Sequence, residues 1–149
     1  MKSKLYWGCA TVLFVVAFVG LVQEITDPEA AYKRTVDQYT HLYTYGVKGG
    51  ETPRETLDLF ITALDEGDID EALLYVDPEQ RDRYEADMRE GLENGNLELV
   101  LEDYRNIDHE NKVGDSRYEF YSTDLKTGTR LTYGLFYNDL ANIWMFESI

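Results

Sequence analysis

The feature that most constrains this chain is an uncharged apolar segment close to its N-terminus. Residues 5–22 read LYWGCATVLFVVAFVGLV, 18 residues without a charged side chain. An α-helix rises about 1.5 Å per residue, so this run would be about 27 Å long, close to the hydrocarbon thickness of a bilayer. We therefore predict a transmembrane helix over residues 5–23, with the lipid bilayer as the partner of Leu5 to Val22.

The charges on either side of this run predict its orientation. Lys2 and Lys4 precede it, whereas all 29 Asp and Glu residues follow it. Tyr6 and Trp7 stand where interfacial aromatic residues are expected. Under the positive-inside rule, residues 1–4 are cytoplasmic and the C-terminal part is extracytoplasmic. The expected location is the cell membrane, with a single pass.

Three other interpretations of the apolar run are open. A cleaved signal peptide has small residues at a cleavage site beyond a shorter apolar core, but here the small pair Val15 and Ala17 lies inside the run. A lipoprotein would have its cysteine after the apolar core, whereas Cys9 precedes most of it. A buried helix of a globular domain seldom has 18 uncharged residues in succession. The sequence favours the anchor over all three.

Charge balance and cysteine content exclude further classes. The chain has 14 Lys and Arg against 29 Asp and Glu, a net charge of −15. Nucleic-acid binding needs clustered cations, so we expect no nucleic-acid partner. Cys9 is the single cysteine, which excludes an intramolecular disulfide and a cysteine-based zinc site.

Residues 24–50 are predicted to form a juxtamembrane stalk helix and a linker. Asp27-Pro28-Glu29 is a typical helix start, because aspartate caps the first turn and proline fits its backbone angle. Spacings of four, three and four residues place one set of side chains on a single helical face: Tyr32, Val36, Tyr39 and Tyr43. This face either packs on the downstream domain or forms a partner surface for a second copy or another protein. Gly46 and Gly49-Gly50 mark the boundary.

Residues 51–149 are predicted to form an α+β domain that begins with three helices. Thr52-Pro53-Arg54-Glu55 is a capping box, and the apolar residues behind it recur at helical spacing: Leu57, Phe60, Ile61 and Leu64. Asp68 and Glu71 repeat the cap for a short helix to Val76. Asp77-Pro78-Glu79 opens a third helix, whose inner face carries Tyr84, Met88 and Leu92 and which ends at Gly95.

Beyond Gly95 the pattern changes to one typical of strands. Leu97, Leu99 and Leu101 alternate with polar residues in the segment 96–104, which predicts a first strand. Further strands are predicted over residues 116–123, 129–137 and 143–146. Helices followed by an antiparallel meander indicate an α+β fold in which the three helices pack on a curved antiparallel sheet of about four strands.

The segment TPRETLDLFITALDEGDIDEALLYVDPEQRDRY resembles the opening of small bacterial domains of the nuclear transport factor 2-like superfamily. It is similar in particular to extracytoplasmic domains of unknown function close to the lumazine-binding-like group. The Asn138-Asp139 turn followed by Ile143-Trp144-Met145-Phe146 resembles their closing strand. The resemblance implies a half-open cone around a helix, often with an apolar pocket at its mouth and often dimeric. The sheet region departs from this pattern because it is short, so we expect a shallow or filled pocket.

No catalytic or metal-binding pattern stands out in the sequence, and we expect no cofactor and no metal. His41 and His109 are far apart, and the consecutive Asp108-His109-Glu110 would splay in an extended chain. Some members of the superfamily use a pocket carboxylate as a general base, for which a buried acid is needed. The acids beside predicted strands are Asp103, Glu119 and Asp124.

The expected function is therefore binding by a membrane-anchored, extracytoplasmic, non-catalytic domain. A ligand pocket is predicted among aromatic residues of the third helix and the sheet: Tyr84, Tyr118, Phe120, Tyr133 and Trp144. Two alternatives are carried forward. One is an enzyme that uses a pocket carboxylate, and the other is an accessory subunit of a membrane complex.

Overall fold

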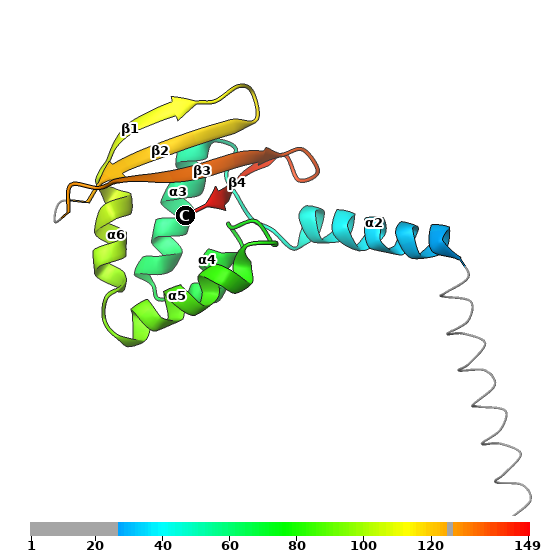
Figure 1. Ribbon diagram of the computed structural model, residues 1–149, viewed down its shortest axis with the longest axis horizontal. Coiled ribbons are helices and arrows are strands. Elements are labelled where there is room, and N and C mark those ends of the chain that lie inside the picture. Colours follow the sequence, from blue (N-terminus) through cyan, green and yellow to red (C-terminus); the bar gives the residue numbers. More distant parts are fainter. Residues whose placement is uncertain (1–26, 125–126) are drawn as a thin grey trace, which may run out of the picture. The chain divides into compact units, whose positions relative to one another are not determined.

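The computed structural model describes residues 27–124 and 127–149, and the chain divides into two compact units, residues 1–40 and 41–149 (Figure 1). The predicted transmembrane helix over residues 5–23 lies outside the described residues. Among the helices that are described, none combines the length and the apolar character needed to cross a membrane.

The predicted stalk helix is present as α2, Pro28–Tyr45. It begins as expected, because the Asp27 side chain accepts a hydrogen bond from the backbone N–H of Ala30 at 3.1 Å. The four residues of the predicted face differ in burial. Tyr32, Val36 and Tyr39 are exposed, whereas Tyr43 is 5% exposed and belongs to the second unit.

Three predicted helices of the second unit are α3 (Pro53–Asp65), α4 (Ile69–Leu73) and α5 (Arg81–Glu93). The predicted caps of α3 and α4 are confirmed: Thr52 accepts from the N–H of Glu55 at 3.2 Å, and Asp68 from that of Glu71 at 2.9 Å. The apolar stripe of α3 is confirmed too, since Leu57, Phe60 and Leu64 are buried and Ile61 packs against the core.

The predicted start and inner face of α5 need correction. Asp77 does not cap this helix: its side chain accepts from the N–H of Glu79 in a turn, and α5 begins at Arg81. On the predicted inner face, Met88 is buried and Tyr84 is half-buried, but Leu92 is exposed.

The prediction of a strand over residues 96–104 is wrong, because this segment forms a fourth helix, α6, Leu97–Arg105. The spacing of its leucines fits both the two-residue repeat of a strand and the repeat of a helix. Leu97 and Leu101, followed by Tyr104, recur at the spacing of one helical face, and all three are buried, whereas Leu99 is exposed. Burial of that helical face decides the conformation.

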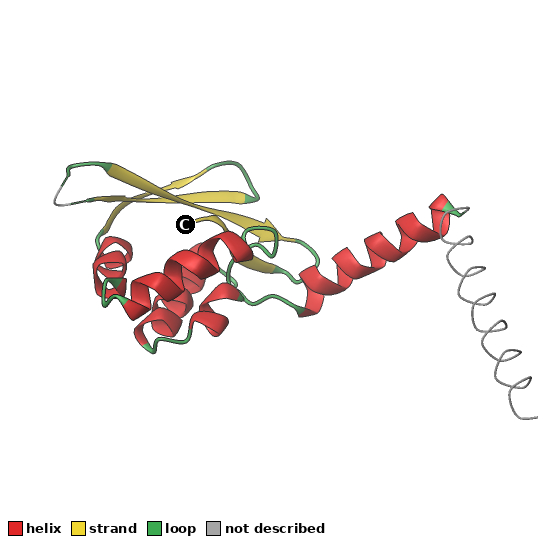
Figure 2. Ribbon diagram, turned by 60° about the horizontal axis from the view of Figure 1, so that its bottom comes forward, coloured by secondary structure: helices red, strands yellow, loops and turns green. Residues whose placement is uncertain are grey.

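The sheet contains β1 (Ile107–Lys112), β2 (Arg117–Thr123), β3 (Arg130–Asn138) and β4 (Ile143–Ser148), in the antiparallel order β1-β2-β3-β4. The last three strands lie close to where the sequence predicts them. The sequence predicts no strand at β1. β1 is an edge strand whose residues after Ile107 are all exposed, so no apolar alternation marks it. Figure 2 shows the helices of the second unit on one side of this sheet.

The core lies between the helices and the facing side of the sheet. Phe120 pairs with Tyr133 across β2 and β3, and Leu135 pairs with Phe146 across β3 and β4. All four side chains are buried. The Phe60 ring of α3 lies 4.8 Å from that of Phe146, between ring centroids, so the first helix of the domain packs directly on its last strand.

The outer edge of β4 is covered by segments from earlier in the chain. The N–H of Trp144 donates to the carbonyl of Gly50 at 2.9 Å, and the Thr56 hydroxyl donates to the carbonyl of Trp144 at 2.9 Å. At Phe146 the N–H donates to the carbonyl of Tyr75, and its carbonyl accepts from the N–H of Asp77 at 2.8 Å. Two segments far apart in sequence therefore complete this strand.

Residues 41–50 are part of this unit rather than a free linker. A Cβ at Gly49 would lie 2.0 Å from the carbonyl oxygen of Trp144, so a side chain there would clash with backbone. The Tyr43 hydroxyl donates to Asp77, and the Tyr43 carbonyl accepts from the Asn138 amide at 2.7 Å. The Arg81 guanidinium donates to the carbonyl of Gly46 at 2.9 Å.

We expect a fragment of residues 41–149 to unfold in one cooperative transition and a fragment of residues 51–149 to be less stable by about 3 to 5 kcal/mol. The shorter fragment loses the burial of Tyr43 and the partners of Asn138, Trp144 and Arg81. Urea unfolding followed by circular dichroism measures the difference, with the full chain as reference. Equal midpoints for the two fragments would contradict the assignment of residues 41–50 to the domain.

Candidate functional site

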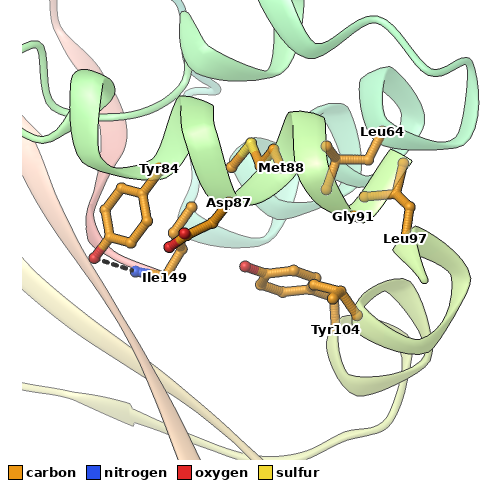
Figure 3. A pocket seen from close by; sticks show the side chains of 9 residues that line it. Leu64, Tyr84, Asp87, Met88, Gly91, Leu97, Tyr104 and Ile149 are labelled. Atoms are coloured by element: carbon orange, nitrogen blue, oxygen red, sulfur yellow. Dashed lines mark hydrogen bonds between the residues drawn. The ribbon is translucent and has the colours of Figure 1, made fainter. Parts of the chain in front are cut away.

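A small hollow of about 190 Å³ lies where α5 and α6 meet α3 and Ile149, the residue that follows β4 (Figure 3). Its size is close to that of an apolar cavity of about 150 Å³ that holds benzene. Apolar and aromatic side chains make up most of its lining: Leu64, Tyr84, Asp87, Met88, Gly91, Leu97, Val100, Tyr104 and Ile149. The hollow is thus large enough for a ligand of a few non-hydrogen atoms.

The helical periods of α5 and α6 bring these residues together. Tyr84, Met88 and Gly91 lie four and three residues apart on one face of α5. The chain then turns sharply, with the N–H of Asn96 donating to the carbonyl of Gly91 at 2.8 Å, and α6 faces α5. At the mouth, Val100 is exposed although it is apolar.

Tyr104 is the polar residue buried most deeply around the hollow. It is 4% exposed, and its ring packs on Phe60 and on Tyr133, with centroids 5.3 and 4.6 Å away. Its hydroxyl points into the hollow (Figure 3), and no hydrogen bond to it is found among the described residues. Since no fully enclosed side-chain oxygen or nitrogen of these residues lacks a partner, the Tyr104 oxygen is itself reached through the hollow, where it can bind an occupant.

Burial, and then the neighbouring Tyr133, Tyr84 and Asp103, raise the pKa of the Tyr104 hydroxyl well above its ordinary value of 10.0. It is therefore a neutral phenol at physiological pH. A neutral phenol both donates and accepts hydrogen bonds, so Tyr104 can bind either kind of polar group.

Of the five residues that the sequence predicted for a pocket, Tyr84 lines this hollow. Its hydroxyl accepts a hydrogen bond from the N–H of Ile149 at 3.3 Å, drawn as a dashed line in Figure 3. Tyr133 lies behind Tyr104, and its hydroxyl is 3.2 Å from that of Ser122. Burial raises the pKa of Tyr133 as well.

The structure places the other three predicted residues in a separate aromatic group. The Tyr118 ring lies 5.2 Å from that of Phe120 and 6.2 Å from that of Trp144, between centroids. The Arg54 guanidinium lies 4.8 Å from the Phe120 ring. None of the three lines the hollow. Sequence reasoning missed Tyr104, because a strand over residues 96–104 would have put it on a different face from its helical neighbours.

None of the three acids singled out in the sequence lines the hollow. Asp103 is half-buried on α6, Glu119 accepts a hydrogen bond from the Tyr121 hydroxyl, and Asp124 accepts from the N–H and hydroxyl of Thr127 in a turn. Asp87 lines the hollow and is exposed. Within residues 27–124 and 127–149, no aspartate or glutamate is buried.

The histidines lie against tyrosines instead of other potential ligands. His41 is 5.1 Å from the ring of Tyr45, and His109 is 5.6 Å from that of Tyr121. In the described part of the chain, no three His, Cys, Asp or Glu side chains are grouped so that they could hold a metal ion.

Comparison of the chain with models of protein families, with curated proteins and with solved structures found no match. The resemblance to the nuclear transport factor 2-like superfamily therefore stays a prediction from the sequence. The α+β architecture with its four-stranded antiparallel sheet is a finding of the structure itself.

Two matched substitutions test how the tyrosine hydroxyls are partnered. Tyr104→Phe should change the free energy of unfolding by less than about 0.5 kcal/mol, because no hydrogen bond of the Tyr104 hydroxyl is found among the described residues. Tyr133→Phe should cost about 1 to 2 kcal/mol, because it removes the partner of the buried Ser122 hydroxyl. Urea unfolding of the full chain measures both, and an equal loss in the two variants would mean that Tyr104 has a partner in the protein.

Proposed function

We propose that this chain is a membrane-anchored, extracytoplasmic, non-catalytic protein whose domain of residues 41–149 binds a small, largely apolar ligand in the hollow between α5 and α6. The observation that carries the binding proposal is Tyr104, whose side chain is 4% exposed, whose hydroxyl faces the hollow and for which no hydrogen bond is found among the described residues.

The composition of the hollow supports ligand binding. Small-molecule sites are concave and mostly apolar, with a few polar groups that fix orientation. Here Leu64, Met88 and Leu97 supply apolar surface, and Tyr84 and Tyr104 supply hydroxyls. Filling such a space removes apolar surface from water at about 25 cal/mol per Å², while the phenol of Tyr104 would gain the hydrogen bond that it lacks.

The enzyme alternative finds less support. General-base catalysis by a carboxyl group at neutral pH calls for an acid that is shielded from water. Asp87, the acid of the hollow, is exposed. The binding proposal needs no such group, and for this reason we favour it.

The membrane location rests on the sequence. The uncharged run Leu5 to Val22, preceded by Lys2 and Lys4 and followed by all of the acids, supports a single-pass anchor with residues 1–4 in the cytoplasm. Such an anchor would keep the acidic domain at the outer surface of the membrane. It would also suit the alternative role of an accessory subunit.

Titration of the full chain with benzene tests the ligand proposal. We expect saturable changes in the methyl NMR signals of residues around the hollow, namely Leu64, Met88, Leu97, Val100 and Ile149. Val100→Trp should abolish them, because the larger side chain would fill the mouth while its exposed position tolerates the change. Leu140→Trp, at an exposed apolar position that does not line the hollow, is the matched control. Absence of saturable changes in the wild-type chain would contradict the proposal.

A second role is favoured by the exposed face of α2. Tyr32, Val36 and Tyr39 are 72%, 41% and 48% exposed at helical spacing, so three large side chains share one solvent-exposed face of α2. We propose that this face mediates self-association or binds a protein partner.

Sedimentation of the full chain in detergent tests self-association. The Tyr32→Ser, Val36→Ser double variant should raise the dimer dissociation constant at least about tenfold, since each lost apolar contact contributes on the order of 1 kcal/mol. Lys33→Ser, on the same helix and also exposed, should leave it unchanged. A wild-type chain that stays monomeric would exclude the second copy as partner.

A further inference from the structure

The polar groups of the hollow are gathered at one end of it. In Figure 3 the hydroxyls of Tyr84 and Tyr104 and the carboxylate of Asp87 surround one region, whereas Leu64, Gly91 and Leu97 lie at the opposite end. A ligand that fills this space would therefore have an apolar body and a polar head. The chemistry of that head follows from the three oxygen-bearing side chains.

We propose that the ligand is a small primary amine with an apolar or aromatic body, bound with its ammonium group between Asp87, Tyr104 and Tyr84. This inference rests on the proposed binding function and specifies the chemical class of the ligand. It follows from the set of polar groups, which offers hydrogen-bond acceptors and negative charge together.

The lining contains acceptors and no cation. Asp87 contributes a carboxylate, the two tyrosines contribute phenol oxygens, and no Lys, Arg or His is among the described residues that line the hollow. An ammonium group has three donors and no acceptor, so it matches this set. A carboxylate ligand would have to lie beside Asp87 without a compensating charge.

The hydroxyl of Tyr104 can serve this role because it has no competing partner in the described part of the protein. It points toward the region of the hollow where Asp87 lies. An ammonium group in that space would donate to both.

Charges outside the lining of the hollow also favour a cationic ligand. Asp103 lies close enough to Tyr104 and Tyr133 to raise the pKa of both hydroxyls, so its field reaches the inner side of the hollow. The chain as a whole carries a net charge of −15, which raises the local concentration of cations and lowers that of anions. The Arg83 guanidinium is the exception, lying 5.5 Å from the centroid of the Tyr84 ring, but it does not line the hollow.

The test compares three probes of similar shape on the full chain at neutral pH and low salt: phenethylamine, 2-phenylethanol and phenylacetate. Methyl NMR titration gives a dissociation constant for each at the hollow. We expect phenethylamine to bind about five times more tightly than 2-phenylethanol, or better, because charge-assisted hydrogen bonds are the stronger ones. Phenylacetate should bind most weakly.

Variants identify the groups responsible. Asp87→Asn should remove the preference for the amine and leave the affinity for 2-phenylethanol unchanged. Tyr104→Phe should weaken the binding of both. Glu93→Gln, an exposed acid on α5 that does not line the hollow, removes the same charge and should keep the preference, which separates a local effect of Asp87 from that of net charge.

The outcomes distinguish this inference from the function on which it rests. If benzene and 2-phenylethanol bind in the hollow but phenethylamine binds no more tightly, the ligand proposal stands and the inference of an amine is wrong. A preference that survives Asp87→Asn also overturns the inference. If no aromatic probe perturbs the methyl groups of the hollow, both proposals fall.

Discussion

The fold of residues 41–149 depends on how the outer edge of β4 is completed. Trp144 and Phe146 turn their backbone N–H and carbonyl groups away from β3, and Gly50, Thr56, Tyr75 and Asp77 satisfy all four. Unsatisfied backbone groups in a protein interior cost about as much as a lost hydrogen bond each. The last strand is therefore tied to Gly50 ahead of α3, to Thr56 within α3 and to the segment after α4.

The hydrogen bonds along the outer edge of β4 also position the hollow. Asp77 is held on Phe146, so the chain that leaves it enters α5 beside the end of β4, and Tyr84 then meets the N–H of Ile149. On the other side, Tyr104 belongs both to the core, through its contacts with Phe60 and Tyr133, and to the hollow, through its hydroxyl. The aromatic core and the hollow are consequently parts of one packing arrangement.

Sequence reasoning succeeded where the signals were local. Thr52 and Asp68 cap helices within three residues of themselves, and buried residues alternate with more exposed ones in β2 and β3. It failed where two local patterns compete or where none exists. The leucines of α6 fit a strand and a helix alike, and β1 is polar and exposed, so that pairing with β2 alone defines it. The error in α6 concealed Tyr104, and Tyr84 was the one pocket prediction that the hollow retained.

The sequence by itself determined the net charge of −15, the apolar run near the N-terminus, the starts of α2, α3 and α4 and the α+β order of elements. These properties depend on composition or on residues close together in the chain. The tertiary structure alone decided that residues 41–50 belong to the domain and that Tyr84, Asp87 and Tyr104 surround one hollow. The physical reason is that segments as distant in sequence as Gly50 and Trp144 bury each other and satisfy each other's hydrogen bonds. A local sequence pattern does not show which distant segment a residue will contact.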